Sequence, residues 1–179
     1  MSPAQIRRAT LSPIILVTGG ARSGKSAHAE TRARAFPGQR HYIATCRPGN
    51  DHEMHARIAR HVNARGEAWV TVEEPFDLVG ALERSDGRGP RLIDCLTLWL
   101  ANLMFDDRPW QPEAEALVAA LAGQRSPVVL VSNEVGMGIV PENALARAFR
   151  DAQGWLNQCV AGMADEAEFV VSGLPLRLK

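Results

Sequence analysis

The feature that most restricts the fold of this 179-residue chain is the segment GGARSGKS at residues 19–26. It satisfies the pattern G-x-x-x-x-G-K-[ST], follows directly on the apolar run 14–18, and precedes a segment rich in Ala and Glu. A buried strand, a glycine-rich turn and a helix in this order bring backbone N–H groups together where they bind phosphate oxygens. The sequence therefore predicts a nucleoside triphosphate site.

Three side chains are predicted to act on the triphosphate. The ammonium of Lys25 neutralises phosphate charge, and the hydroxyl of Ser26 ligates Mg²⁺. Asp94 ends an apolar run, where P-loop proteins commonly place the carboxylate that orients the metal ion. The alternative for Asp94 is a capping role for a helix expected to begin near Leu96. Ser26 and Asp94 are the predicted Mg²⁺ ligands.

Short apolar runs alternate along the chain with longer segments of helical period. Most of these runs are apolar on both faces, as is typical of parallel strands that helices cover from both sides. The sequence therefore predicts an α/β fold with a mostly parallel central sheet and helices on both faces. The expected strands are residues 14–18, 41–45, 69–72, 91–96, 128–132 and 168–173.

Residues 1–13 are expected to form a flexible tail, and residues 14–179 one domain, since a chain of this length can bury a single core. Pro75 and Pro112 stand where prolines are tolerated in the first turn of a helix, and Pro141 opens a long helical segment.

The charge balance gives no indication of a nucleic-acid partner, because 20 Lys and Arg residues offset 20 Asp and Glu residues. The three cysteines are far apart in the sequence, which suits a reducing compartment. No run reaches the roughly 18 apolar residues of a membrane span. These features predict a cytoplasmic protein without stable membrane insertion.

A segment with several histidines, residues 51–65, is also predicted to be helical. At 3.6 residues per turn, Arg57 and Arg65 lie one turn to either side of His61. Two neighbouring cations disfavour the imidazolium and favour the neutral imidazole, which can attack phosphorus. The alternative is an inert, hydrogen-bonded histidine on a helix face.

Taken together, these motifs resemble the bifunctional adenosylcobinamide kinase/adenosylcobinamide-phosphate guanylyltransferase family (CobU or CobP). The resemblance covers nearly everything from Ile14 to Lys179, and its most specific parts are the segment 133–143 and the helix ending in His61. The segments that carry it are GGARSGKS (19–26), YIAT (42–45), EMHARIARH (53–61), EEP (73–75), DCLTLWLANLMF (94–105), NEVGMGIVPEN (133–143) and VSGLPLRLK (171–179).

The resemblance implies a RecA-like P-loop NTPase fold, a homotrimer and two successive reactions at one nucleotide site. ATP or GTP first phosphorylates the aminopropanol hydroxyl of adenosylcobinamide. GTP then gives GMP to His61 and releases pyrophosphate, and adenosylcobinamide phosphate takes the GMP to become adenosylcobinamide-GDP. The implied nucleotide contacts are Gly19, Gly20, Ala21, Arg22, Ser23, Gly24, Lys25, Ser26, Ala44, Thr45, Cys46, Val62, Asn63, Ala64, Arg65, Glu73 and Asp94.

Several alternatives stay open at this point. Glu73 and Asp94 could each position the metal ion, bind guanosine hydroxyls or deprotonate the cobinamide hydroxyl. The segment 133–143 is either part of the site or a glycine-rich turn after a buried strand, and its place after a parallel strand favours the site. Two other functions compete: a simple small-molecule kinase in which His61 is structural, and a GTP-dependent switch protein.

Overall fold

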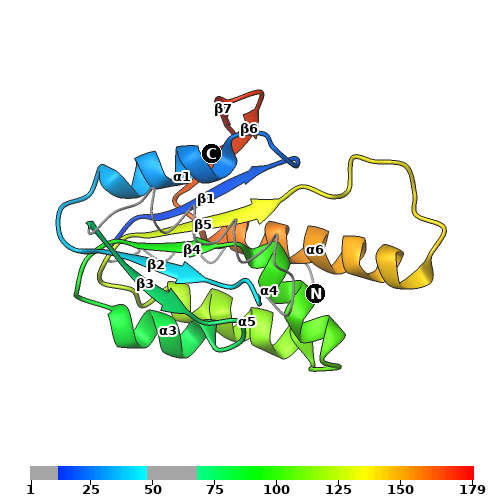
Figure 1. The fold of residues 1–179 in the computed structure, drawn as a ribbon, viewed down its shortest axis with the longest axis horizontal. Helices are drawn as coiled ribbons and strands as arrows, with labels where there is room; N and C mark the ends of the chain where they lie inside the picture. Colours follow the sequence, from blue (N-terminus) through cyan, green and yellow to red (C-terminus); the bar gives the residue numbers. More distant parts are fainter. Residues whose placement is uncertain (1–11, 48–67) are drawn as a thin grey trace.

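The computed structural model describes residues 12–47 and 68–179, and one sheet runs through it in the order β3-β2-β4-β5-β1-β6-β7 (Figure 1). Every adjacent pair is parallel except β6 and β7. The strands are β1 Ile14–Gly19, β2 Arg40–Ala44, β3 Trp69–Glu73, β4 Arg91–Asp94, β5 Val128–Asn133, β6 Glu166–Val171 and β7 Leu174–Arg177.

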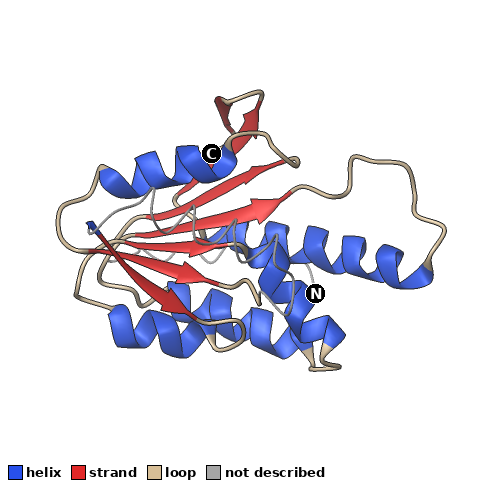
Figure 2. Cartoon of the chain, viewed as in Figure 1, coloured by secondary structure: helices blue, strands red, loops and turns tan. Residues whose placement is uncertain are grey.

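Helices cover both faces of the sheet (Figure 2). One face packs against α1, and the other packs against α3 to α6. The predicted α/β fold with a mostly parallel sheet and helices on both faces is confirmed. In the part of the chain that the structure describes, no helix is long and apolar enough to cross a bilayer. The helices are α1 Lys25–Arg34, α3 Leu78–Ser85, α4 Leu96–Phe105, α5 Trp110–Leu121 and α6 Ala144–Met163.

The strands are apolar on both faces because each face has its own core. Along β1, Ile14 and Leu16 pack with α3 to α6, whereas Ile15 and Val17 pack with α1. All four side chains are buried, so successive residues serve opposite layers, as the two-residue period of a strand requires. This alternation also fixes which face each polar residue at the end of a strand lies on.

Several details of the predicted elements are wrong. The runs 91–96 and 168–173 form strands at 91–94 and 166–171, and Pro141 lies before the long helix, which Asn143 caps and which begins at Ala144. The short strand β7 is not predicted from the sequence, because its four residues LPLR contain a proline, which is tolerated only at a sheet edge. Pro75 lies before α3 and not in its first turn. That helix begins at Leu78, since the side chain of Asp77 accepts a 2.8 Å hydrogen bond from Gly80 N and caps it.

The carboxyl ends of β1 and β5 form a topological switch point. These strands are neighbours, and Gly19 pairs with Asn133 in their register. The chain leaves β1 into α1 on one face of the sheet and leaves β5 toward α6 on the other face. Open parallel sheets bind ligands where neighbouring connections diverge in this way.

The amino-terminal end of the sheet is held by a buried ion pair. Arg91 is fully buried and donates 2.8 Å hydrogen bonds to Asp86 Oδ1, Gln124 Oε1 and Ser126 O. Burial alone raises the pKa of the Asp86 carboxyl, but hydrogen bonds from the side chains of Arg91 and Arg125 and from the backbone of Arg125 outweigh it and hold this pKa well below its usual range. The ionised carboxylate therefore stabilises the fold.

Replacing Asp86 by Asn is expected to lower the free energy of unfolding at pH 7 by about 3 kcal/mol, because it leaves Arg91 buried without its counter-charge. A carboxyl whose folded pKa is depressed stabilises the protein fully above its unfolded pKa of about 3.9, and this contribution is lost as the pH falls below that value. Urea unfolding of both proteins should show the difference narrowing progressively below about pH 4.

The control is Asp151→Asn, which breaks a pair between Arg150 and an exposed carboxylate and should change stability by less than about 0.5 kcal/mol. A difference between wild type and Asp86→Asn that stays constant down to about pH 2 would contradict the role assigned to the carboxylate.

Candidate active site

The predicted phosphate loop connects β1 to α1, and glycine is required at two of its positions. A Cβ atom on Gly19 would lie 2.5 Å from Val170 O, which no side chain tolerates. Gly24 has φ +94°, and a Cβ atom there would lie 3.1 Å from Gly173 Cα. The backbone of the loop is therefore packed directly against β6 and the turn that follows it.

The amino end of α1 is available to an anion. Gly24 occupies the N-cap position, no side chain caps the helix, and its first turn has no acidic residue. The first N–H groups of a helix lack partners within the helix, and the helix dipole places partial positive charge at the same point. Lys25 adds a full charge, since its ammonium lies over the loop and donates a 3.2 Å hydrogen bond to Gly20 O. The arrangement suits a phosphate group.

Asp94 lies at the carboxyl end of β4, on the face that α1 covers. Its Oδ2 accepts a hydrogen bond from the hydroxyl of Tyr42 on the neighbouring strand β2. The N-cap of α4 is Cys95, without a side-chain hydrogen bond, so the structure does not support the capping alternative for Asp94. The carboxylate is instead held at the edge of the sheet where the phosphate loop lies.

Ser26 and Asp94 offer the ligand types that Mg²⁺ prefers. Ser26 is half-buried in the first turn of α1, a helix that packs over β4 and β5. A hydroxyl and a carboxylate oxygen together fit an ion that takes its other ligands from water and phosphates. Within the described ranges, no cluster of three or more His, Cys, Asp or Glu residues forms a closed metal site.

The exits of β2 and β3 lie side by side, because Ala44 pairs with Glu73. Thr45 is fully buried, and its Oγ1 accepts from Cys95 N and donates to Cys95 O, both at 2.8 Å. Asn102 Nδ2 then donates to Thr45 O at 2.8 Å and to Pro75 O at 3.1 Å. The Thr45 side chain thus has a structural role at this exit, whereas Glu73 is exposed.

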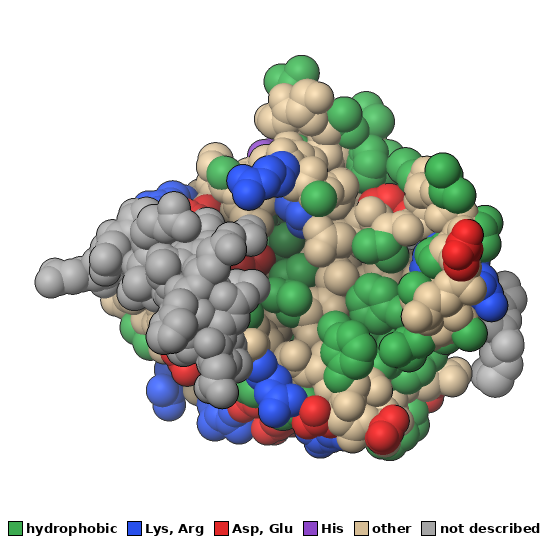
Figure 3. Space-filling model, turned by 45° about the vertical axis from the view of Figure 1, so that its right-hand side comes forward, with side chains coloured by type: hydrophobic (Ala, Val, Ile, Leu, Met, Phe, Trp, Pro, Cys, Tyr) green, Lys and Arg blue, Asp and Glu red, His purple; other side chains and the backbone are tan. Residues whose placement is uncertain are grey.

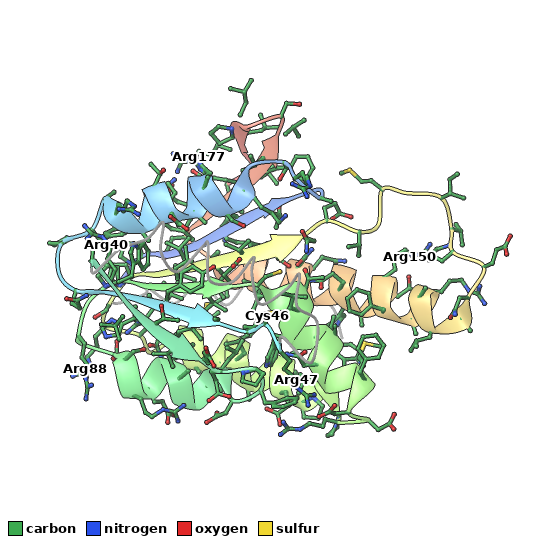
Figure 4. All side chains as sticks on the ribbon, viewed as in Figure 1. Arg40, Cys46, Arg47, Arg88, Arg150 and Arg177 are labelled. Carbon is green, nitrogen blue, oxygen red and sulfur yellow. The ribbon has the colours of Figure 1, made fainter. Side chains whose placement is uncertain are left out.

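Cys46 and Arg47 follow this exit beside α4 (Figure 4). Cys46 is half-buried, and Arg47 Nη1 donates a 2.8 Å hydrogen bond to Asp106 Oδ1. Arg40 and Arg88 lie near the opposite end of the sheet in the same view, so they do not contribute to the site. Of the cysteines, Cys95 directly follows Asp94, and burial together with that carboxylate raises the pKa of its thiol. A protonated thiol is a poor competing nucleophile.

The predicted residues His61, Val62, Asn63, Ala64 and Arg65 lie outside the described residues. The structure brings the remaining predicted residues to one edge of the sheet: 19–26 after β1, Ala44 to Cys46 after β2, Glu73 after β3 and Asp94 after β4. Three supporting residues were not predicted from the sequence. Tyr42 donates to Asp94, Asn102 donates to Thr45 O, and the N–H of Gly173 donates a 2.8 Å hydrogen bond to Ser23 O in the phosphate loop. Each lies in a segment that carries the family resemblance, but none stands in a local pattern that predicts its contact.

The fold and this edge of the sheet define a class of protein. A parallel sheet, an uncapped helix after a glycine loop, a lysine over that loop and a carboxylate two strands away are the parts of a P-loop enzyme that acts on nucleoside triphosphates.

The chain belongs to the family described as cobinamide kinase / cobinamide phosphate guanyltransferase, whose family model matches residues 15–178. It is 45% identical to the bifunctional adenosylcobalamin biosynthesis protein CobP of Pseudomonas aeruginosa, over 92% of this chain and 96% of that protein. It is 43% and 42% identical to the bifunctional adenosylcobalamin biosynthesis proteins CobU of Salmonella typhimurium and Escherichia coli, over 93% of this chain and 99% of each relative. The resemblance read from the motifs is confirmed.

Proposed function

We propose that this protein phosphorylates adenosylcobinamide with ATP or GTP and then transfers GMP from GTP to the product through a covalent GMP-histidine at His61. The family match supports the two activities, and the phosphate loop over an uncapped α1 carries the proposal in the structure. Residues 14–179 would act as one catalytic domain, and the protein would work in the cytoplasm.

In the kinase reaction, the aminopropanol oxygen of adenosylcobinamide bonds to the γ-phosphorus, the bond from that phosphorus to the bridging oxygen breaks, and a nucleoside diphosphate leaves. The hydroxyl proton passes to a base, for which Glu73 and Asp94 are the candidates. Lys25 and the N–H groups of the loop stabilise charge on the phosphate oxygens. Ser26 and Asp94 would hold Mg²⁺, which neutralises further phosphate charge when bound.

In the guanylyl transfer, a neutral histidine nitrogen bonds to the α-phosphorus of GTP and pyrophosphate leaves. A phosphate oxygen of adenosylcobinamide phosphate then bonds to the same phosphorus, the N–P bond breaks, and the histidine is restored. The proposed nucleotide contacts beside it are Ala44 to Cys46, Val62 to Arg65 and Glu73.

The two described histidines have other roles, which leaves the histidines of residues 51–65 as candidates for the nucleophile, and the family resemblance assigns this role to His61. Nε2 of His28 lies 2.7 Å from Glu168 Oε2, so this ring is already paired. His41 is buried near the start of β2, at the far end of the sheet from the phosphate loop, and burial together with Arg91 lowers its pKa. The nucleophile is therefore expected among the histidines of residues 51–65.

One incubation separates this function from its competitors. Purified protein is given GTP, Mg²⁺ and adenosylcobinamide, and the corrinoid products are identified by mass spectrometry. Adenosylcobinamide-GDP is the expected product. Adenosylcobinamide phosphate alone would favour a simple kinase, and GTP hydrolysis that does not depend on the corrinoid would favour a switch protein.

An exposed apolar surface supports a further part of the proposal, the homotrimer. The segment between β5 and α6 extends away from the sheet (Figure 1), and its Met137 and Ile139 are 79% and 98% exposed. Apolar side chains gather on this side of the molecule (Figure 3), around a groove lined by Ala101, Met104, Phe105, Asn143, Leu145, Ala146 and Phe149. Exposed apolar patches of this kind mark binding surfaces.

Light scattering is expected to give three chain masses for the parent protein. Ile139→Asp should shift the mass toward that of one chain, because a charge in an apolar interface must be desolvated without a partner. Ile139→Val keeps the surface apolar and should keep the assembly. A parent protein that is monomeric and fully active would contradict the trimer, and a trimeric Ile139→Asp variant would place the interface elsewhere.

A further inference from the structure

We propose that Asn133 is a catalytic residue of the phosphoryl transfer, whose side-chain amide donates a hydrogen bond to the transferred phosphoryl group. The inference rests on the proposed kinase function and adds a residue that the phosphate-loop and carboxylate motifs do not include. Four observations support it: the position of Asn133 in the sheet, the hydrogen bonds that fix its backbone, the face of the sheet on which its side chain lies, and the weak hydrogen-bond acceptor that its side-chain amide now contacts.

The place comes from the strand order. β5 lies between β1, which leads into the phosphate loop, and β4, which ends in Asp94. In the two registers, Asn133 pairs with Gly19 while Val131 pairs with Asp94. Asn133 therefore reaches two residues beyond the level of the carboxylate and stands beside the first residue of the phosphate loop.

The backbone of Asn133 is held at both its N–H and its carbonyl. Its N–H donates a 2.8 Å hydrogen bond to Thr97 Oγ1 on α4, and its carbonyl accepts a 3.1 Å hydrogen bond from Asn157 Nδ2 on α6. The next N–H, of Glu134, donates to Gly19 O at 3.1 Å. The position is thus fixed relative to the phosphate loop, as a group that stabilises a transition state without reorganisation must be.

The side chain of Asn157, which bonds to Asn133 from α6, is itself part of a buried polar network. Ser132 and Gln153 are both fully buried, and the hydroxyl of Ser132 donates to Asn157 Oδ1 at 2.6 Å. Gln153 Nε2 donates to Ser132 Oγ and to Asn157 Oδ1, both at 2.9 Å. The carboxamide of Asn157 is therefore oriented so that its N–H points at the carbonyl of Asn133.

The side chain of Asn133 lies on the face that α1 covers. Val129 and Val131 pack with α1, and Ser132 bonds to α6 on the opposite face, so the alternation of the strand returns Asn133 to the side of α1. Asp94 lies on this same face. The half-buried carboxamide thus shares a layer with the amino end of the helix that binds the phosphates.

The amide of Asn133 has a weak partner. Among the described residues, its Nδ2 donates to Cys95 Sγ at 3.6 Å, and thiol sulfur is a poor acceptor. A phosphate oxygen is a much stronger acceptor for the same N–H, because a hydrogen bond to a charged group is roughly twice as strong as one between neutral groups. Charge that develops on the transferred phosphoryl oxygens would strengthen this hydrogen bond.

The test measures adenosylcobinamide phosphorylation, nucleotide affinity and thermal unfolding for Asn133→Ala and Asn133→Asp. Losing one such donor should lower kcat of the kinase reaction by roughly 10- to 100-fold, while nucleotide affinity changes by less than about 3-fold. Asp has the shape of Asn but places a carboxylate oxygen where the donor was, so its kcat should be no higher than that of the Ala variant. A structural role predicts the reverse order, since Asp disturbs packing less.

The control is Gln124→Ala, which removes a buried carboxamide at the opposite end of the sheet, where it accepts from Arg91 and donates to Ala120 O. It should lower the unfolding temperature and leave kcat unchanged. A kcat within about 3-fold of wild type in Asn133→Ala would overturn the proposal, as would a higher kcat in Asn133→Asp than in Asn133→Ala. Absence of corrinoid phosphorylation by the wild-type protein would instead refute the proposed function itself.

Discussion

Replacing Lys25 by alanine is expected to lower both the kinase and the guanylyl-transfer rates by about 100-fold or more, because each reaction builds negative charge on phosphate oxygens at the same loop. Among the described residues of the loop, no other cation can take the place of the Lys25 ammonium, since Arg22 is exposed at the tip of the turn. Folding should be unaffected. The ammonium makes one hydrogen bond, to Gly20 O, and alanine has the highest intrinsic helix propensity.

The chain has only one other lysine, Lys179, and this residue provides a matched control. Its ammonium donates to the carbonyls of Ala161, Gly162 and Ala164 at the end of α6, at 3.2, 3.1 and 2.6 Å. Lys179→Ala should therefore lower the unfolding temperature and leave both rates intact, which is the opposite of the Lys25 result. Near-normal transfer by the Lys25 variant would remove the phosphate loop from the mechanism.

His61→Asn is expected to abolish the covalent enzyme–GMP adduct and to reduce guanylyl transfer by roughly 1000-fold, because asparagine lacks the imidazole lone pair that attacks phosphorus. Phosphorylation of adenosylcobinamide should persist within about 10-fold, since that step needs the phosphate loop, Mg²⁺ and a bound acceptor. The two activities of one chain would thus be separated by a single substitution.

The adduct is measured with GTP labelled at the α-phosphate. Label bound to the parent protein should be lost in acid and survive alkali, as expected of phosphorus bonded to an imidazole nitrogen. His28→Asn is the control, because this ring is paired with Glu168 and should not carry the label. A His61→Asn variant that still takes up label of the same stability would exclude His61, and His52 and His55 would then be the candidates.

Much of the fold was predictable because each buried strand leaves a strong local signal. β1 and β5 are apolar on both faces, and glycine, lysine and serine at fixed spacing identify the loop that follows β1. Asp94 was predictable as well, since it closes an apolar run. These features need no knowledge of which segments lie together in space.

What could not be predicted depends on contacts between distant segments. The hydroxyl of Tyr42 bonds to Asp94, which lies 52 positions away in the sequence. Asn102 connects the ends of β2 and β3 through hydrogen bonds to Thr45 O and Pro75 O, although the sequence of its helix indicates only an apolar core helix. Strand β7 is too short to be predicted from its own residues, and it forms because it pairs with the free edge of β6. The predicted roles of His61 and of residues 62–65 stay predictions.

The position of β1 between β5 and β6 has a consequence for synthesis of the protein. Residues 14–19 leave the ribosome early, but their partner strands are residues 128–133 and 166–171, and the turn at Gly173 completes the support of the phosphate loop. The nascent chain must therefore hold an unpaired apolar strand until residues 128–133 and 166–171 have emerged. The chain is therefore expected to bind nucleotide only after these later segments have been synthesised. Chains released before that point would expose an unpaired apolar strand, which promotes aggregation and chaperone binding.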